Sequence, residues 1–136
     1  VEMVDKKTLL LNSDFVSLNT DLNETSRHLM GPDAFEFMRE DAVLINTSRG
    51  PVVNEDALID ALQGGAIRGA ALDVFEDEPL SEDNPLRSMD NVMLAPHNAN
   101  SSPEAWEHVH RNTIQKLLRE LTGGAPSDET LKNLVQ

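Results

Sequence analysis

The sequence has no cysteine, few basic residues and no long apolar run. Without cysteine, the chain can form no disulfide and offers no thiolate ligand to a metal ion. Its 24 acidic residues outnumber the 11 basic ones and give a formal net charge of −13, which opposes contact with nucleic acid or anionic membranes. No apolar stretch approaches the roughly 20 residues of a membrane-spanning helix, and no signal-peptide pattern is present. We therefore expect a cytoplasmic protein that binds neither nucleic acid nor membrane.

A glycine-rich motif for binding dinucleotides is also missing. No Gly-x-Gly-x-x-Gly occurs in the 136 residues. The acidic residue that follows such a motif by about 20 positions and holds the adenosine ribose is missing with it. The sequence thus provides no glycine turn on which a pyrophosphate could rest.

Strands and helices are expected to alternate along the chain. Apolar runs predict strands at residues 1–4, 14–19, 42–45, 69–75 and 91–95. Capping residues and apolar periodicity predict helices at 5–11 (N-cap Asp5), from 31–32 onward, at 55–63 (N-cap Asn54) and from 102–104 to about 121. After a glycine-rich break, Ser127 can cap a last short helix. This alternation predicts an α/β fold, a doubly wound parallel sheet with helices on both faces.

Three segments that follow predicted strands carry side chains suited to acid–base chemistry. They are Asn46-Thr47-Ser48-Arg49-Gly50, the acidic stretch at 70–79, and Ala95-Pro96-His97. Because the carboxyl ends of parallel strands meet at one edge of a sheet, we expect an arginine, a carboxylate and a histidine to converge there. Such a set can hold a carboxylate substrate and move a proton.

Together these segments resemble the D-isomer-specific 2-hydroxyacid dehydrogenases, a family that includes phosphoglycerate, glycerate and formate dehydrogenases. The resemblance covers residues 1–121 and implies the second half of a dinucleotide-binding domain, with 122–136 as a C-terminal tail. It implies a partial Rossmann-like sheet that lacks the first two strands, in which residues 1–4 form the third strand. Since the sequence begins without methionine, with Val1 already inside an apolar run, we expect a truncated reading frame or an excised segment.

The resemblance implies three catalytic residues. Arg49 grips the substrate carboxylate, because a planar guanidinium matches two oxygens. His97 exchanges a proton with the substrate oxygen, which suits a side chain that titrates near neutrality. Glu78 orients this histidine and favours its protonated form. The alternatives are a surface arginine that caps a turn and, for Glu78, a solvated acid in the loop Glu76-Asp77-Glu78.

The resemblance also implies NAD or NADP as cofactor. The residues implied to contact it are Thr20, Thr47, Ser48, Arg49, Asp73 and His97, although Asp73 could instead stabilise the fold. Asn19 and Asp21 stand where histidine and proline are usual, and Asp21 places a negative charge near the pyrophosphate. With the glycine-rich loop missing, we expect impaired cofactor binding. His28, His108 and His110 show no pattern of partners and are expected at the surface.

We expect the chain to be a fragment of an NAD(P)-dependent oxidoreductase that interconverts small 2-hydroxy and 2-keto acids. We expect the chain alone to be inactive. The sequence does not show which acid is the substrate, or whether the cofactor is NAD or NADP. The alternative is a non-catalytic half-domain, an interaction or scaffold module that self-associates. Loss of the first two strands exposes the edge at 14–19, and a homodimer that hides it is expected.

Overall fold

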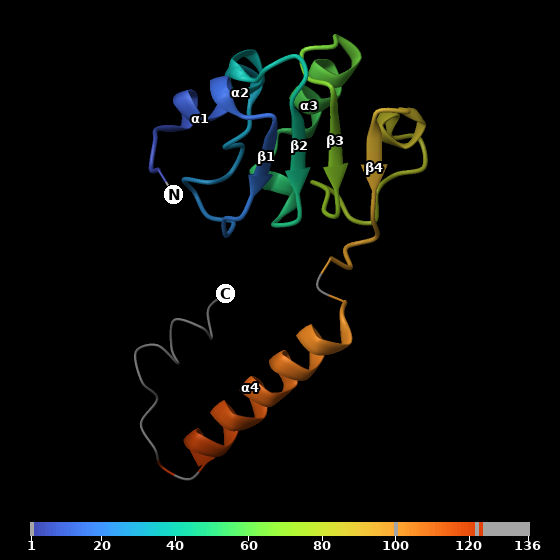
Figure 1. Ribbon diagram of the computed structural model, residues 1–136. Coiled ribbons are helices and arrows are strands. Elements are labelled where there is room, and N and C mark those ends of the chain that lie inside the picture. The colour runs from blue at the N-terminus through green and yellow to red at the C-terminus, as the bar shows by residue number, and fades with distance from the viewer. Residues whose placement is uncertain (1, 100, 122, 124–136) are drawn as a thin grey trace. The chain divides into compact units, whose positions relative to one another are not determined.

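The computed structural model describes residues 2–99, 101–121 and 123 and divides the chain into two units, Val1–His97 and Asn98–Gln136. Four parallel strands form one sheet in the first unit (Figure 1). They are β1 (Phe15–Leu18), β2 (Val43–Asn46), β3 (Gly69–Leu72) and β4 (Val92–Leu94), side by side in chain order. The parallel α/β architecture predicted from the sequence is thereby confirmed.

Two of the three helices in this unit begin at a capping side chain. They are α1 (Lys6–Asn12), α2 (Pro32–Phe37) and α3 (Glu55–Gln63), with short 3-10 turns η1 (Gly50–Val52) and η2 (Pro85–Ser88). Asp5 accepts a hydrogen bond from the Thr8 amide at 3.0 Å, and Asn54 accepts one from the Ala57 amide at 2.8 Å. Each cap satisfies a backbone donor that the first helical turn leaves without a partner. Both caps were predicted.

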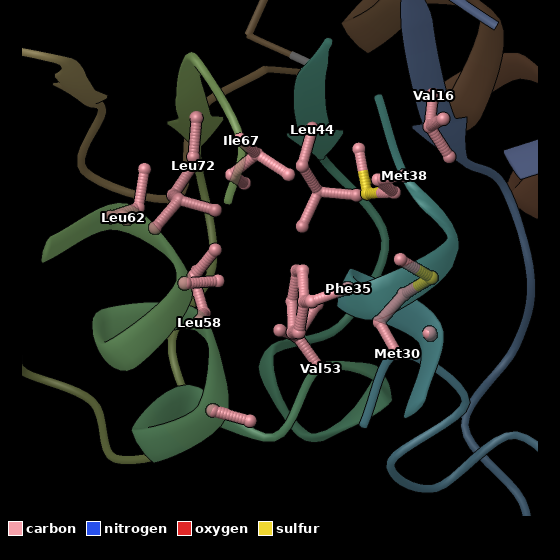
Figure 2. Packing of buried hydrophobic residues seen from close by; sticks show 14 of the residues in the cluster. Val16, Met30, Phe35, Met38, Leu44, Val53, Leu58, Leu62, Ile67 and Leu72 are labelled. Atoms are coloured by element: carbon pink, nitrogen blue, oxygen red, sulfur yellow. The ribbon is translucent and has the colours of Figure 1, made fainter. Parts of the chain in front are cut away.

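The hydrophobic core lies on one face of the sheet, under the helices. Figure 2 shows Leu44 of β2 and Leu72 of β3 on the same side as Phe35 of α2 and Leu58 of α3. In β1 and β2, buried residues alternate with exposed or half-buried ones, as expected for a sheet whose faces differ in environment. This packing fixes the strands, and with them the loops at their carboxyl ends.

The opposite face of the sheet is open within the first unit. Phe15 is 68% exposed and Met93 72%, and both lie on the face that α2 and α3 do not cover. Helices were expected on both faces of the sheet, but the helices of residues 2–97 cover only one face. β1 lies at the end of the strand order, so its outer edge pairs with no strand among the described residues, as predicted.

The prediction of a strand at 1–4 is wrong for residues 2–4, which the structure describes. Residues 2–4 are exposed and outside any strand, and no strand among the described residues pairs with them. β3 also ends at Leu72 rather than Phe75. The Asp73 amide still donates to the Asn46 carbonyl at 3.0 Å, and the chain then turns away from the ladder.

The second unit contains α4 (Pro103–Leu121), which begins and ends as predicted. The Ser102 hydroxyl accepts a hydrogen bond from the Ala105 amide at 3.0 Å, which supports the first turn. The predicted short helix after Ser127 and the tail at 122–136 lie outside the described residues, Gly123 excepted. None of the described helices is both long and apolar enough to cross a membrane.

Candidate active site

The turn that carries Arg49 is shaped by Asn46, the last residue of β2. The buried Asn46 side chain accepts hydrogen bonds from the Ser48 amide at 3.1 Å and the Ser48 hydroxyl at 2.9 Å. Its amide group donates to the Arg49 carbonyl at 3.0 Å. Asn46 was not among the predicted site residues, although an asparagine that ends a buried strand is a signal for such a turn.

Gly50 brings this turn against the loop that follows β3. A Cβ atom at this position would lie 1.7 Å from the Phe75 carbonyl oxygen, so no other residue fits without moving backbone. Arg49 itself is exposed, and its Nη1 donates to the Ser48 carbonyl at 2.6 Å. Among the described residues, Arg49 forms no hydrogen bond or ion pair with Glu78 or His97.

Glu78 and His97 form the pair that the sequence predicted. His97 Nδ1 lies 2.8 Å from Glu78 Oε2, and the other carboxylate oxygen accepts a hydrogen bond from the Phe75 amide at 3.0 Å. The two side chains are 36% and 48% exposed, so water and small solutes reach them. His97 has a positive φ of 54°, a conformation uncommon outside glycine.

The carboxylate form of Glu78 is stabilised by its hydrogen bonds. The bond from His97 and then the bond from the Phe75 amide hold the pKa of Glu78 below its usual value, against the opposing effects of partial burial and of the negative charge of Asp73. Glu78 is therefore ionised at neutral pH. A carboxylate at Nδ1 fixes the orientation of the imidazole ring.

A cavity of about 380 Å³ lies beside this pair. Its wall is mostly apolar, with Phe75, Glu78, Pro79, Leu80, Arg87, Leu94, Ala95, Pro96 and His97 lining it. Arg87 is part of the wall structure, because its guanidinium donates to the carbonyls of Leu80 at 2.6 Å and Ser81 at 2.7 Å. A cavity of this size can accept a small organic molecule next to an acid–base pair.

The remaining predicted cofactor residues lie after the same ends of the strands. Asp73 is buried directly after β3, and Thr47 and Ser48 follow β2. Thr20 follows β1, and its hydroxyl donates to the Asp21 carbonyl at 3.3 Å. The Asp21 carboxylate accepts two hydrogen bonds from the Asn23 side chain at 3.2 Å. Its negative charge thus remains beside Thr20.

His28 is exposed, as expected, but it has a partner that the sequence pattern does not show. His28 Nε2 lies 2.5 Å from Glu76 Oε1, so Glu76 is not a freely solvated loop acid either. The interaction joins residues 48 positions apart, which local sequence patterns do not reveal. His108 and His110 are exposed on α4, as expected, and the His110 ring contacts that of Trp106 at a centroid distance of 5.4 Å.

Comparison with known proteins identifies the family. Residues 1–99 match the family model for the NAD-binding domain of D-isomer-specific 2-hydroxyacid dehydrogenases. The chain belongs to this family. The match covers every predicted site residue, from Thr20 to His97, and the family resemblance inferred from three short segments is confirmed.

Several glyoxylate reductases are relatives of this chain. It is 44% identical over 126 residues to the glyoxylate reductase of Thermofilum pendens, covering 93% of this chain and 37% of the relative. It is 41% identical over 136 residues to that of Korarchaeum cryptofilum, covering 100% of this chain and 41% of the relative. The chain therefore spans about two fifths of the length of these relatives.

Solved structures of family members have the same fold. A D-isomer-specific 2-hydroxyacid dehydrogenase from Xanthobacter autotrophicus, in complex with NADPH and MES, superposes with a TM-score of 0.78 at 36% identity, covering 88% of this chain and 49% of that one. An NAD-complexed member from Lactobacillus delbrueckii gives a TM-score of 0.80 at 31% identity, covering 90% and 41%. The chain is thus part of a Rossmann-like domain, as predicted.

Proposed function

We propose that this chain serves as part of an NAD(P)-dependent oxidoreductase that interconverts a small 2-hydroxy acid and the corresponding 2-keto acid. The observation that carries the proposal is the contact of 2.8 Å between Glu78 and His97 at the carboxyl end of a parallel sheet. A histidine held by an ionised carboxylate is an acid–base device, and both side chains are partly exposed. The family relationship supplies the reaction class.

Arg49 binds the substrate carboxylate. Its guanidinium is exposed and uses Nη1 on the Ser48 carbonyl. Since a guanidinium has five N–H donors, enough remain for a two-point contact with a carboxylate. The Asn46 bonds and the Gly50 contact fix the turn on which Arg49 lies, so the charge is presented from a defined backbone.

His97 moves the proton. Glu78 occupies Nδ1, which leaves Nε2 as the nitrogen that faces the substrate oxygen. In the reductive direction, Nε2–H donates its proton to the carbonyl oxygen of the keto acid, and in the oxidative direction Nε2 takes the hydroxyl proton. Glu78 stabilises the imidazolium form in both directions, without itself becoming protonated.

NAD or NADP fits the same end of the sheet. Parallel sheets bind dinucleotides at this end, where the chain offers the carboxylate of Asp73 and the hydroxyl and backbone groups of Thr47 and Ser48. A further hydroxyl, that of Thr20, follows β1. When bound, the nicotinamide donates or accepts the hydride. The negative charge of Asp21 and the missing glycine motif predict that the chain alone binds the cofactor weakly.

Further parts of the proposal follow from the charge and the open surfaces. The working compartment is the cytoplasm, and residues 1–121 form half of the cofactor domain. The chain forms a homodimer through the unpaired edge of β1 and the open face that carries Phe15. The substrate is a small carboxylic acid rather than nucleic acid or lipid.

A graft into an intact relative tests the catalytic assignment. In the glyoxylate reductase of Korarchaeum cryptofilum, the matching segment is replaced by residues 1–136, and reduction of glyoxylate, hydroxypyruvate and pyruvate by NADH and NADPH is measured. We expect activity that depends on His97. A folded graft that binds the cofactor but reduces none of these acids would argue against the proposal.

A second candidate function is a non-catalytic interaction module, which the open sheet face and the free edge of β1 favour. Calorimetric titration of residues 1–136 with NADH tests it. Binding in the micromolar range at physiological salt contradicts both this alternative and the expectation of weak binding. No binding, together with an active graft, means that the residues are catalytically competent and only the phosphate-binding half is lacking.

A further inference from the structure

Glu76 is held from two sides, unlike an ordinary loop acid. Its Oε1 lies 2.5 Å from His28 Nε2, and its Oε2 accepts a hydrogen bond from the Glu55 amide at 3.3 Å. In return, the Glu76 amide donates to the Glu55 carboxylate at 3.2 Å, and Asn84 donates to that carboxylate at 2.7 Å. The loop after β3 is thereby bonded to the first turn of α3, where backbone N–H groups favour negative charge.

His28 connects this loop to the turn of Arg49. The His28 amide donates to the Pro51 carbonyl at 2.8 Å, two residues after Arg49. His28 has a φ of 53°, in the left-handed region that few residues other than glycine adopt. From this backbone its ring reaches Glu76, so His28 bridges the segment that carries Arg49 and the loop that carries Glu78.

Phe75 is the point at which these restraints meet. Its carbonyl lies against Gly50, and its amide donates to Glu78 Oε1 at 3.0 Å. Glu76 is the next residue along the chain, so the bonds of Glu76 to His28 and Glu55 restrain the Phe75 peptide from the other side. A shift of this loop would change the distance between Glu78 and one of its two hydrogen-bond donors.

We propose that His28 and Glu76 are positioning residues, whose contact fixes the Glu78–His97 pair relative to the Arg49 turn. The catalytic meaning of this assignment rests on the proposed function. Neither residue touches the substrate or the reacting atoms in that function, so their effect passes through Phe75 and Glu78.

The titration of Glu78 reports the position of its carboxylate in the whole chain, without any catalysis. Hydrogen bonds from His97 and the Phe75 amide lower the pKa of Glu78, so a loosened loop weakens these bonds and raises that pKa. Carboxyl ¹³C NMR of residues 1–136 measures it in the wild type, His28→Ala and Glu76→Gln. Positioning predicts that Glu78 titrates at a higher pH in both variants.

A pure charge effect predicts the opposite result for Glu76→Gln, because removal of a nearby negative charge lowers the pKa of a carboxyl group. Asp77→Asn is the matched control, since it removes an exposed charge from the same loop, next to Glu78. We expect no upward shift there. His28→Gln keeps an amide donor toward Glu76 and should restore most of the wild-type titration.

The proposal is wrong if Glu78 titrates at or below its wild-type pH in His28→Ala and Glu76→Gln while the amide signals of the sheet are retained. If Glu76→Gln does not fold, the comparison of His28→Ala with His28→Gln decides, because both variants lack the imidazole and only the second keeps a donor toward Glu76. Such a result would leave the proposed function standing, because the Glu78–His97 pair would then hold without its neighbours. An inactive graft, in contrast, would contradict the proposed function and leave the positioning of Glu78 intact.

Discussion

At the scale of single residues, the contact between Glu78 and His97 makes the most direct prediction. In the graft described above, His97→Ala removes the group that exchanges a proton with the substrate oxygen. We expect kcat to fall by about 10²–10⁴-fold, the usual contribution of a positioned acid or base, with a smaller change in KM. Steady-state kinetics with glyoxylate measures both. His108→Ala, on the exposed surface of α4, is the control and should leave kcat unchanged.

Arg49→Lys should affect binding more than the chemical step. A lysine keeps the positive charge but loses the planar pair of donors that matches a carboxylate. KM for the keto acid should therefore rise, with some loss of kcat if the same contact aligns the substrate for hydride transfer. Kinetics at several substrate concentrations separate the two effects. An unchanged KM would place Arg49 on the surface of its turn, outside the substrate site.

Glu78 also predicts how stability depends on pH. Because the folded-state pKa of Glu78 is lowered, its contribution is fully present above the unfolded value, roughly 4.3, and is lost as the pH falls through the folded value. The effect is small, since the carboxylate is partly exposed. Glu78→Gln should lower the melting temperature near neutral pH, and the difference from wild type should shrink in acid. A difference that does not change with pH would contradict this assignment.

At the scale of elements, Gly50 determines how closely the turn after β2 approaches the loop after β3. Gly50→Ala places a methyl group 1.7 Å from the Phe75 carbonyl oxygen, so backbone must move. We expect a loss of at least about 2 kcal/mol of unfolding free energy, measured by urea denaturation. Gly31→Ala is the matched control: its nearest contact would be 3.4 Å, and it should cost about 0.5–1 kcal/mol, because glycine is preferred over alanine at the N-cap of a helix.

Elements whose signals are local were predictable from the sequence. The caps Asp5 and Asn54 depend on neighbouring residues, and the structure has them as expected. The contact of His28 with Glu76 depends on how loops meet, and no periodicity encodes it. The strand at 1–4 failed for a related reason: a strand-like pattern forms a strand only where a partner strand lies beside it.

The same reasoning applies to the site. Arg49, Glu78 and His97 were predicted from three motifs at the carboxyl ends of strands of one parallel sheet, and the structure brings Glu78 and His97 into contact. Asn46 and Gly50, which fix the backbone turn that carries Arg49, were part of the first motif but received no role. Their importance depends on the hydrogen bonds and on the close approach of Phe75, which only the three-dimensional structure shows.

At the scale of the whole molecule, two opposing forces decide assembly. The open sheet face with Phe15 and the free edge of β1 favour association, while a net charge of −13 on each copy opposes it. Salt screens the repulsion, because the Debye length falls to about 10 Å at 0.1 M ionic strength, but it leaves apolar contact intact. We therefore expect a homodimer in light scattering whose population rises with salt concentration.

Phe15→Lys should abolish this dimer. The variant places a charge on the exposed face at the start of the edge strand, where a partner copy would have to bury it. It also makes the net charge less negative by one, so weaker association cannot come from increased repulsion. Glu24→Gln changes the net charge by the same amount at an exposed position away from the sheet and should dimerise as the wild type does. A wild-type chain that remains monomeric at high protein concentration and high salt would show that neither the edge nor the face drives assembly.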